Sequence, residues 1–300
     1  MSETATATDI TAATAAPSTP ESALATESES PSGMVDRVVL ILEVFERSGG
    51  PLTLGQISAR TRLPRSSVHR ILQQLVSARL LSRDTNEYRL GLRMFEIGSL
   101  VVHHTRMSDV ARPLLQELCA ATGHVVHLAV LDQQDVVYLE RVGGAFASVL
   151  PSRVGGRLPA HCTAVGKAIL AYSDRETVDQ YLWSGLRRRT DRSLITPQAL
   201  TSALARIRGT GYATELGESV AGVSCVAAPV LLLDAPVAGI SVCGPHDRIR
   251  VDELKFRVKW IAAEISRRLT ATNRSGPRRL ISTVPLSGHL ASVASPGAAR

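Results

Sequence analysis

Apolar positions recur with the spacing of a helix along LPRSSVHRILQQL, residues 63–75. At about 100° per residue they fall on one side, as in a helix packed on a core: Val68, Ile71, Leu72, Leu75 and Val76. Pro64 suits a helix start, because its missing N–H would have no intrahelical partner there. The opposite arc carries no carboxylate and consists of Ser66, Ser67, His69, Arg70, Gln73, Gln74 and Ser77. This pattern predicts a helix whose exposed face suits an anionic partner.

The flanking residues predict the remaining elements of a small domain. We expect a helix over 35–47, a second helix opened by a capping box from Thr53 to Gln56 and ending near Thr61, and extended runs over 80–83 and 87–90. The residues between the two extended runs, Asp-Thr-Asn, are typical of turns. Helix, helix, turn, helix and hairpin form the order of a winged helix-turn-helix, in which the third helix enters the major groove of DNA.

Basic charge is concentrated in this same segment of a chain whose net charge is +7. Residues 34–107 hold eleven arginines against six acids, and no acid lies between Arg47 and Arg83. Such a distribution is typical of proteins that bind phosphate backbones, although a genome rich in G and C also favours arginine on solvated surfaces. We expect double-stranded DNA to be contacted by Arg65, Ser66, Ser67, His69, Arg70, Gln73, Arg83 and Arg89.

Composition divides the whole chain into five segments. The boundaries expected are a disordered tail over 1–33, the winged helix-turn-helix over 34–91, a linker helix over 92–107, a second domain over 108–272 and a disordered basic tail over 273–300. The linker carries a wide apolar band, which predicts burial against a second copy of the chain. Four widely spaced cysteines, no signal peptide and no long apolar run favour a cytoplasmic protein with reduced thiols and no membrane partner.

The second domain reads as antiparallel α+β. We expect strands over 125–131, 136–142, 147–151, 212–216, 224–233 and 237–243, and helices over 109–122, 163–172, 197–209 and 251–269, with one more opening at 173–176. No glycine-rich dinucleotide loop, P-loop, HExxH or CxxC motif is present. The sequence therefore predicts neither a cofactor nor a metal site.

Several stretches together resemble one family, the isocitrate-lyase-regulator (IclR) family of bacterial transcription factors. They are LPRSSVHRILQQL, EYRLGLRMFEIGS, HVVHLAVLDQQDVVYLERV, RVGGRLPAHCTAVGKAILAY, GVSCVAAPV and VAGISVCGP, and the likeness runs from about residue 35 to 269. The resemblance implies a winged helix, a linker helix and a GAF-like domain that binds small effectors, often organic acids. It also implies a homodimer or a dimer of dimers.

Two positions depart from what this family usually has. Arg62 stands in the turn before the third helix, where family members usually have glycine. If that position is left-handed, arginine costs roughly 1–2 kcal/mol there, offset by an extra phosphate contact. Cys243 stands where some relatives have serine, which makes the wall of the expected pocket less polar.

The helix start within LPAHCTAVGKA is the expected binding point of an effector carboxylate. Free N–H groups at Thr163, Ala164 and Val165, with the positive end of the helix dipole, favour an anion there. With the resemblance added, the residues expected to bind the effector are Leu158, Ala160, Thr163, Ala164, Glu215, Cys225, Ser241 and Cys243. The alternatives are an ordinary helix cap for Thr163 and a small core residue for Cys225.

Catalysis and zinc binding are the alternatives to consider at His161 and Cys162. A catalytic Cys–His pair needs spatial adjacency and an orienting third group, and zinc bound by these two with Cys225 and Cys243 lacks a recognisable ligand spacing. His124 and His127 are interpreted as packing residues. Three function classes therefore stand: a ligand-responsive DNA-binding regulator, most simply a repressor of a catabolic or metabolic operon; an enzyme built on the second domain; and a winged helix used for protein contacts. The sequence favours the regulator.

Overall fold

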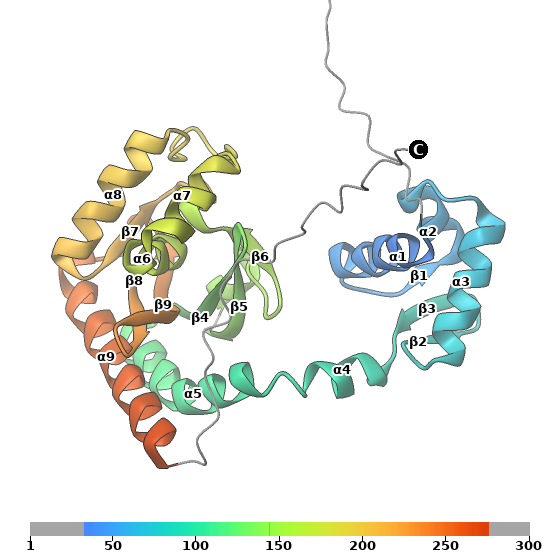
Figure 1. The fold of residues 1–300 in the computed structure, drawn as a ribbon, viewed down its shortest axis with the longest axis horizontal. Helices are drawn as coiled ribbons and strands as arrows, with labels where there is room; N and C mark the ends of the chain where they lie inside the picture. The colour runs from blue at the N-terminus through green and yellow to red at the C-terminus, as the bar shows by residue number, and fades with distance from the viewer. Residues whose placement is uncertain (1–32, 144, 276–300) are drawn as a thin grey trace, which may run out of the picture. The chain divides into compact units, whose positions relative to one another are not determined.

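The computed structural model describes residues 33–143 and 145–275, and the chain divides into two compact units, residues 1–96 and 97–300 (Figure 1). The tails that we expected over 1–33 and 273–300 lie outside the described residues, apart from Gly33 and residues 273–275. Those last three residues belong to the final helix rather than to a tail. Among the described residues, no helix has the length and apolar character needed to cross a membrane.

The first unit is a winged helix-turn-helix. It consists of α1 (Met34–Ser48), β1 (Leu52–Thr53), α2 (Leu54–Thr61), α3 (Arg65–Ser77), β2 (Leu81–Asp84) and β3 (Glu87–Leu90). The capping box at the start of α2 is confirmed, because Thr53 N–H donates to Gln56 Oε1 at 2.9 Å and Gln56 N–H donates to the Thr53 hydroxyl. Strand β1, which we did not expect, joins the hairpin in an antiparallel sheet of order β1-β3-β2.

The apolar arc of the third helix builds the core of this unit. Val68, Ile71, Leu72 and Leu75 of α3 are buried, as the spacing predicted. They pack in one cluster with Ile41 and Phe45 of α1, Ile57 of α2 and the hairpin residues Leu81 and Tyr88. Burying this arc fixes the opposite arc toward solvent, which is how the fold presents the polar face of α3.

The segment that follows the hairpin differs from our expectation of one helix over 92–107 and another over 109–122. The structure contains a short α4 (Leu92–Gly98) and a long α5 (Val102–Thr122) instead. The break falls at 99–101, where the N–H groups of Leu100 and Val101 donate to the carbonyl oxygens three residues earlier. Gly98 and Ser99 are poor helix formers, whereas nothing at residue 108 interrupts the helical hydrogen bonds.

The second unit is α+β, as expected, and its sheet is antiparallel throughout. Besides α5 it contains β4 (Val125–Asp132), β5 (Asp135–Val142), η1 (Ala145–Val149), β6 (Arg157–Pro159), η2 (Ala160–Cys162), α6 (Ala164–Tyr172), α7 (Arg175–Trp183), α8 (Pro197–Thr210), β7 (Ala213–Leu216), β8 (Val223–Leu232), β9 (Ala235–Pro245) and α9 (Val251–Ser275). The strand order is β6-β5-β4-β9-β8-β7.

Helices cover both faces of this sheet (Figure 1). One face packs on α5 and α9 through residues such as Leu128, Val226 and Ile240. The other face packs on α6, which is buried along nearly its whole length, and behind it on α7 and α8. Because side chains alternate along a strand, the residues on either side of those that face α5 and α9 point toward α6.

One expected strand is wrong. Residues 147–151 do not form a strand, since Ala145–Val149 is a 3-10 helix and the edge strand is β6, ten residues later. A short run that is apolar apart from Ser148 fits either conformation, so the pattern alone could not decide between them. The hairpin between β5 and β6 instead uses Val136 and Leu158 as directly paired residues.

Candidate DNA-binding and effector-binding sites

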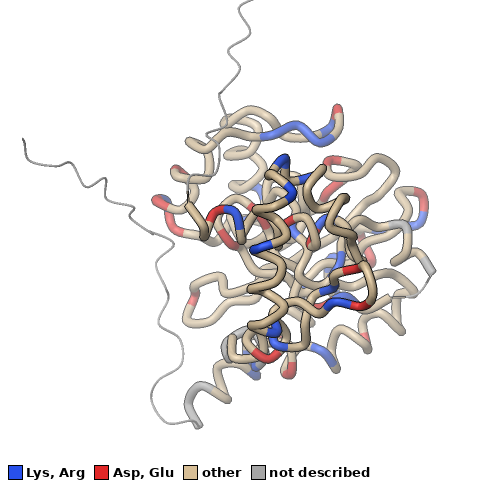
Figure 2. Tube along the Cα trace, turned by 90° about the vertical axis from the view of Figure 1, so that its right-hand side faces the viewer, with Lys and Arg blue, Asp and Glu red and all other residues tan. Residues whose placement is uncertain are grey.

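The exposed arc of α3 carries the expected DNA-reading residues. Arg65, Ser66, Arg70 and Gln73 are exposed, and Ser67 and His69 are half-buried. No acid occurs between Arg47 and Arg83, so nothing on this helix repels an anion (Figure 2, Lys and Arg in blue). This arc therefore forms a neutral-to-basic surface on a helix that its own core holds rigid.

The start of α3 leaves backbone donors available. Pro64 provides no side-chain cap, and within the described part of the chain no hydrogen bond involves the N–H groups of Arg65, Ser66 or Ser67. Free N–H groups and the positive end of the helix dipole bind phosphate well. The first turn of α3 therefore offers backbone donors that suit a phosphate, and the exposed Arg70 lies further along the same helix.

The two hairpin arginines lie on opposite faces of the wing. Strand register pairs Arg83 with Tyr88 and Arg89 with Ser82, and neighbouring positions alternate between faces. The Arg83 guanidinium lies 5.6 Å from the centre of the Tyr88 ring, whereas Arg89 forms an ion pair with Glu87 at 3.6 Å. The structure therefore does not bring Arg83 and Arg89 together on one surface.

The turn between α2 and α3 contains a residue in the left-handed conformation. This is the case in which we expected arginine to be strained. Arg62 has φ 57° and ψ 16°, is exposed, and directly follows the last residue of α2. Thr61 and Ser58 hold the turn with hydroxyl hydrogen bonds to Ile57 O at 2.8 Å and Leu63 O at 2.9 Å. The strain at Arg62 therefore persists because neighbouring groups fix the turn.

The start of α6 is the expected anion-binding point in the second unit. Thr163 caps the helix, accepting the N–H of Gly166 at 3.1 Å. Our expectation of a free N–H at Thr163 is wrong, because that group donates to Ala160 O at 3.2 Å. Among the described residues, the N–H groups of Ala164 and Val165 have no hydrogen-bond acceptor, so two backbone donors remain for a ligand.

A row of buried polar side chains crosses the sheet under α6. Strand register places Glu215 of β7 opposite Cys225 of β8, and Cys225 opposite Cys243 of β9. The adjacent line pairs Ser241 of β9 with His127 of β4. We call these five residues, Glu215, Cys225, Cys243, Ser241 and His127, the polar row. The remaining expected effector residues, Leu158, Ala160 and Ala164, lie in the apolar cluster on the same face.

Hydrogen bonds connect one end of the polar row. The Cys243 sulfur lies 3.6 Å from Ser241 Oγ and 3.6 Å from His127 Nδ1. The other ring nitrogen of His127 lies 2.8 Å from Ser152 Oγ, and the ring centre is 4.9 Å from that of Tyr138. We interpreted His127 as a packing residue, and it is indeed well bonded, but it also belongs to this row.

Glu215 ends the row with one carboxyl oxygen unused. Its Oε1 accepts the N–H of Ser219 at 2.9 Å and the N–H of Glu218. Its Oε2 is buried and has no hydrogen-bond partner within the described residues. Burial raises the pKa of Glu215 to about 7, although the Ser219 N–H acts against the rise. An unpaired buried oxygen costs roughly 1–3 kcal/mol, so this atom suits a proton or a donor group on a ligand.

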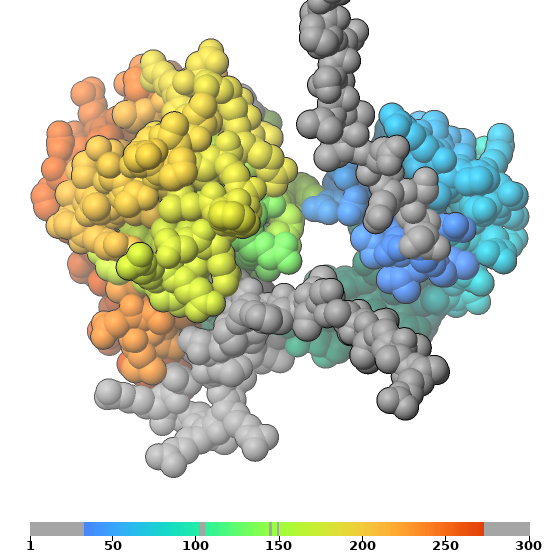
Figure 3. Space-filling model, turned by 45° about the horizontal axis from the view of Figure 1, so that its top comes forward, coloured from blue at the N-terminus to red at the C-terminus, as the bar shows by residue number. Residues whose placement is uncertain are grey.

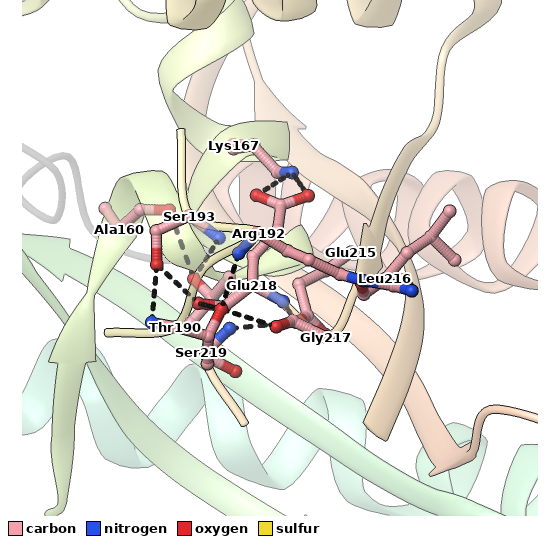
Figure 4. Close-up of polar contacts among 12 residues, drawn as sticks. Ala160, Lys167, Thr190, Arg192, Ser193, Glu215, Leu216, Gly217, Glu218 and Ser219 are labelled. Carbon is pink, nitrogen blue, oxygen red and sulfur yellow. Dashed lines mark hydrogen bonds and ion pairs between the residues drawn. The ribbon is translucent and has the colours of Figure 1, made fainter. Parts of the chain in front are cut away.

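The loop after β7 is fixed to the rest of the domain by polar contacts (Figure 4). Lys167 of α6, which is only 3% exposed, donates to both carboxylate oxygens of Glu218, with 2.6 Å to Oε2. Burial raises the pKa of Glu218 even though Lys167 opposes this. The hydroxyls of Thr190 and Ser193 donate to the carbonyl oxygens of Gly217 at 2.7 Å and Glu218 at 2.8 Å. Through Glu218 the loop is tied to the same helix whose start offers free N–H groups.

The side chains of His161 and Cys162 each contact other groups of the second unit. The His161 ring nitrogens lie 2.8 Å from the Tyr181 hydroxyl and 3.0 Å from Arg187 O, and burial lowers the pKa of this imidazole. Burial raises the pKa of Cys162, whose sulfur lies 3.8 Å from Arg187 O. Across residues 33–143 and 145–275, no three His, Cys, Asp or Glu side chains are arranged to hold a metal ion.

A separate groove of about 320 Å³ lies between α5 and α9. Its lining includes Leu118 and the exposed aromatic residues Phe256 and Trp260. Leu118 belongs to the core on the far side of the sheet from the polar row. In the space-filling view, the yellow atoms of α7 and α8 face the viewer (Figure 3), and these two helices pack on the same face of the sheet as Cys225 and Cys243.

Comparison with known proteins accounts for both units. The C-terminal domain of the bacterial transcriptional regulator IclR matches residues 99–267, and the IclR helix-turn-helix domain matches residues 34–85. The chain belongs to the IclR family. It is therefore a DNA-binding transcriptional regulator with a helix-turn-helix unit and a C-terminal effector-binding unit.

Individual relatives agree with this assignment. The regulator is 35% identical over 200 residues to the transcriptional regulator XynR of Escherichia coli, covering 65% of this chain and 79% of that protein. It is 31% identical over 222 residues to the transcriptional repressor AllR of Salmonella typhi, covering 73% and 82%. An IclR homologue from Microbacterium hydrocarbonoxydans, solved with 4-hydroxybenzoate, superposes with a TM-score of 0.72 at 29% identity, covering 80% of this chain and all of the other.

Sequence reasoning missed Lys167 and Glu218 of the regulator's second unit and interpreted His127 only as a packing residue. The place of His127 in the polar row could have been found, because strand alternation in VVHLAVL puts it on the face opposite Val126 and Leu128. Lys167 and Glu218 could not, because they are 51 residues apart and only the fold brings them together.

Proposed function

We propose that this regulator binds operator DNA through the exposed arc of α3, and that its DNA affinity changes when a small organic acid binds under α6. DNA binding is supported by the exposed arc of α3, which has no acidic residue, and by the free N–H groups at the start of this helix. On α3 the residues assigned to DNA are Arg65, Ser66, Ser67, His69, Arg70 and Gln73, with one of Arg83 and Arg89 from the wing. Repression is the expected direction, since relatives such as AllR are named repressors.

Effector binding is supported by two sets of buried polar groups, one at the start of α6 and one at Glu215. The free N–H groups of Ala164 and Val165 suit a carboxylate, and the unpaired oxygen of Glu215 suits a hydrogen-bond donor on the same ligand or a proton. The 4-hydroxybenzoate bound by the Microbacterium homologue carries a carboxylate and a hydroxyl. We therefore expect a hydroxylated or monocarboxylic acid, contacted by Leu158, Ala160, Thr163, Ala164, Glu215, Cys225, Ser241 and Cys243.

The working form is a homodimer or a dimer of dimers in the cytoplasm. Leu92, Phe95, Ile97 and Leu100 around α4 are exposed within one chain, with Phe95 72% and Leu100 74% exposed. Exposed apolar side chains this close together favour an interface, and paired half-sites in DNA match a two-fold dimer. A second chain is the partner that this proposal assigns to them.

Selection of genomic fragments tests both halves together. Fragmented genomic DNA is passed over the full-length protein, and bound fragments are then challenged with a panel of aliphatic and aromatic carboxylic acids. We expect a few discrete fragments to be retained and at least one acid to change their retention. Uniform retention of all fragments would contradict binding to a specific operator. If no acid changed the retention, control by an organic acid would be contradicted.

The variant Ala164→Asp locates the effector. A fixed carboxylate at the first residue of α6 occupies the expected position of the ligand's own carboxylate and repels it. Titration calorimetry with the acid that acts in the panel should show at least a tenfold weaker affinity, while Ala164→Ser should lose much less. Unchanged acid affinity in a folded Ala164→Asp protein would place the pocket elsewhere.

A further inference from the structure

Two cysteines of the polar row are direct neighbours across two strands. Cys225 and Cys243 occupy opposite positions in the antiparallel ladder between β8 and β9. Opposite residues in such ladders have Cα atoms about 4.5–5.5 Å apart, within the range of roughly 4.4–6.8 Å found across disulfides. Both side chains lie on the face covered by α6 and both are buried, with exposed fractions of 9% and 6%. They are nevertheless free thiols in this structure.

We propose that Cys225 and Cys243 form a peroxide-sensitive thiol pair, in which Cys243 is the attacking sulfur and Cys225 the resolving one. Neither family membership nor the proposed DNA and effector sites requires this reaction. The oxidant is a hydroperoxide, whose small size suits a buried site.

The surroundings distinguish the two sulfurs. Cys243 lies 3.6 Å from both His127 Nδ1 and Ser241 Oγ, so two groups that are able to donate a hydrogen bond face its sulfur. The proximity of the two thiols lowers the pKa of Cys243 and raises the pKa of Cys225. A thiolate, not a thiol, is the nucleophile toward peroxides. Cys243 is therefore the sulfur that attacks.

The reaction balances without any further reagent. The Cys243 thiolate attacks one peroxide oxygen, the O–O bond breaks, and the alkoxide that leaves takes up a proton, which gives a sulfenic acid on Cys243. The Cys225 sulfur then attacks the Cys243 sulfur, and water leaves as the S–S bond forms. Two thiols and one hydroperoxide thus become one disulfide, one alcohol and one water.

The other two cysteines serve as internal references. Cys119 lies on α5, which packs on the opposite face of the sheet, and Cys162 has its sulfur next to Arg187 O. Neither has a cysteine opposite it in a strand pair among the described residues. A preference of peroxide for Cys225 and Cys243 would therefore report their pairing rather than general thiol reactivity.

If the proposed effector site is right, the disulfide also changes that site. It removes the free thiol of Cys225, the residue opposite Glu215, and takes the Cys243 sulfur away from His127. This consequence rests on the proposed function, whereas formation of the disulfide does not. The experiment therefore measures formation of the disulfide itself.

Peptide mass mapping after treatment of the folded full-length protein with hydrogen peroxide decides the proposal. We expect a peptide pair joined through Cys225 and Cys243, reversed by a thiol reductant, with Cys119 and Cys162 still free. The variant Cys225→Ser should instead accumulate a sulfenic acid on Cys243 that a dimedone probe traps, and the double variant Cys119→Ser/Cys162→Ser should form the disulfide at the wild-type rate. Four free thiols after treatment, or a disulfide through Cys119 or Cys162, would overturn the pairing. Sulfenic acid trapped on Cys225 in the Cys243→Ser variant, but not on Cys243 in Cys225→Ser, would overturn the assigned order of attack.

Discussion

Arg62 shows how one residue can store strain at a functional surface. Its left-handed backbone (φ 57°) is costly for any residue with a Cβ, and it lies three positions before the first residue of α3. Glycine would adopt the same conformation without that cost. The arginine therefore does not serve the stability of the turn.

Replacing Arg62 with glycine should stabilise the first unit. We expect the free energy of unfolding to rise by about 0.5–1 kcal/mol, since the relief of strain exceeds the extra entropy of an unfolded glycine. Urea denaturation measures the change. The matched variant Arg60→Gly, inside α2, should lower the stability by about 0.8–1 kcal/mol, and a loss of similar size at Arg62 would mean that the turn is not strained.

Glu215 predicts a pH dependence with a definite sign. Its pKa rises from 4.5 to about 7 in the folded protein because of burial, so the folded state holds a proton that the unfolded state releases at lower pH. Stability contributed by this proton is therefore lost as the pH rises through the window between the two values. Glu215→Gln keeps a neutral side chain at every pH.

The comparison of wild type with Glu215→Gln isolates this residue. Between about pH 5 and pH 8, the wild-type free energy of unfolding should fall relative to that of the variant by about 3 kcal/mol at most. Denaturant titrations at several pH values measure the difference. Parallel curves for the two proteins would show that Glu215 titrates normally and is not desolvated.

At the scale of elements, a buried ion pair connects the lysine of α6 to the loop after β7. Lys167 and Glu218 are both buried, with 3% and 9% exposed. Removing one partner of a buried pair leaves the other charge without compensation, which costs roughly 3–5 kcal/mol. Removing both partners together avoids that penalty.

The Lys167 contact can be tested with a double-mutant cycle. Lys167→Met should destabilise the protein by about 3 kcal/mol or more, and Lys167→Met/Glu218→Met should recover most of the loss. Thermal unfolding of the wild type, Lys167→Met, Glu218→Met and the double variant gives the coupling. Lys255→Met, which removes an exposed pair with Asp252, serves as the control and should change little. A double variant no more stable than Lys167→Met would mean that the two side chains are not coupled.

The elements that sequence patterns predicted are those whose signals are local. The apolar arc of α3, the Thr53 cap of α2 and the turn residues of the wing each lie within a few positions of one another. The break at 99–101 and the 3-10 helix at Ala145–Val149 were missed, because a short apolar run fits several conformations. In each missed case the surrounding fold decides.

The candidate sites divide in the same way. The exposed residues of α3 follow from helical spacing alone, whereas the opposite faces of Arg83 and Arg89 follow from strand register. Glu215, Cys225 and Cys243 came from family resemblance, and only the register shows that they form one line. Pairing across many residues of sequence has no local signal, so Lys167 and Glu218 could be found only in the structure.

At the scale of the whole molecule, the charge distribution predicts how DNA affinity responds to salt. Arginine–phosphate contacts release counterions, so roughly 6–10 contacts per dimer should lower affinity by about 10³–10⁵ between 50 and 200 mM salt. Fluorescence anisotropy with a fragment from the genomic selection measures the slope. A flat profile would contradict binding through the arginine-rich first unit.

The function proposed for this regulator depends on recognition of specific DNA sequences by α3. Sequencing of the DNA that co-purifies with the protein after crosslinking in cells tests it most directly, with wild type compared to Arg70→Ala. Arg70 is exposed and faces away from the core residues Val68 and Leu72, so the variant should fold normally. We predict a small set of enriched sites for wild type, lost in Arg70→Ala at unchanged thermal stability, because a base contact contributes about 1–3 kcal/mol. No enriched sites for wild type, or the same sites at the same enrichment for a folded Arg70→Ala protein, would contradict the account.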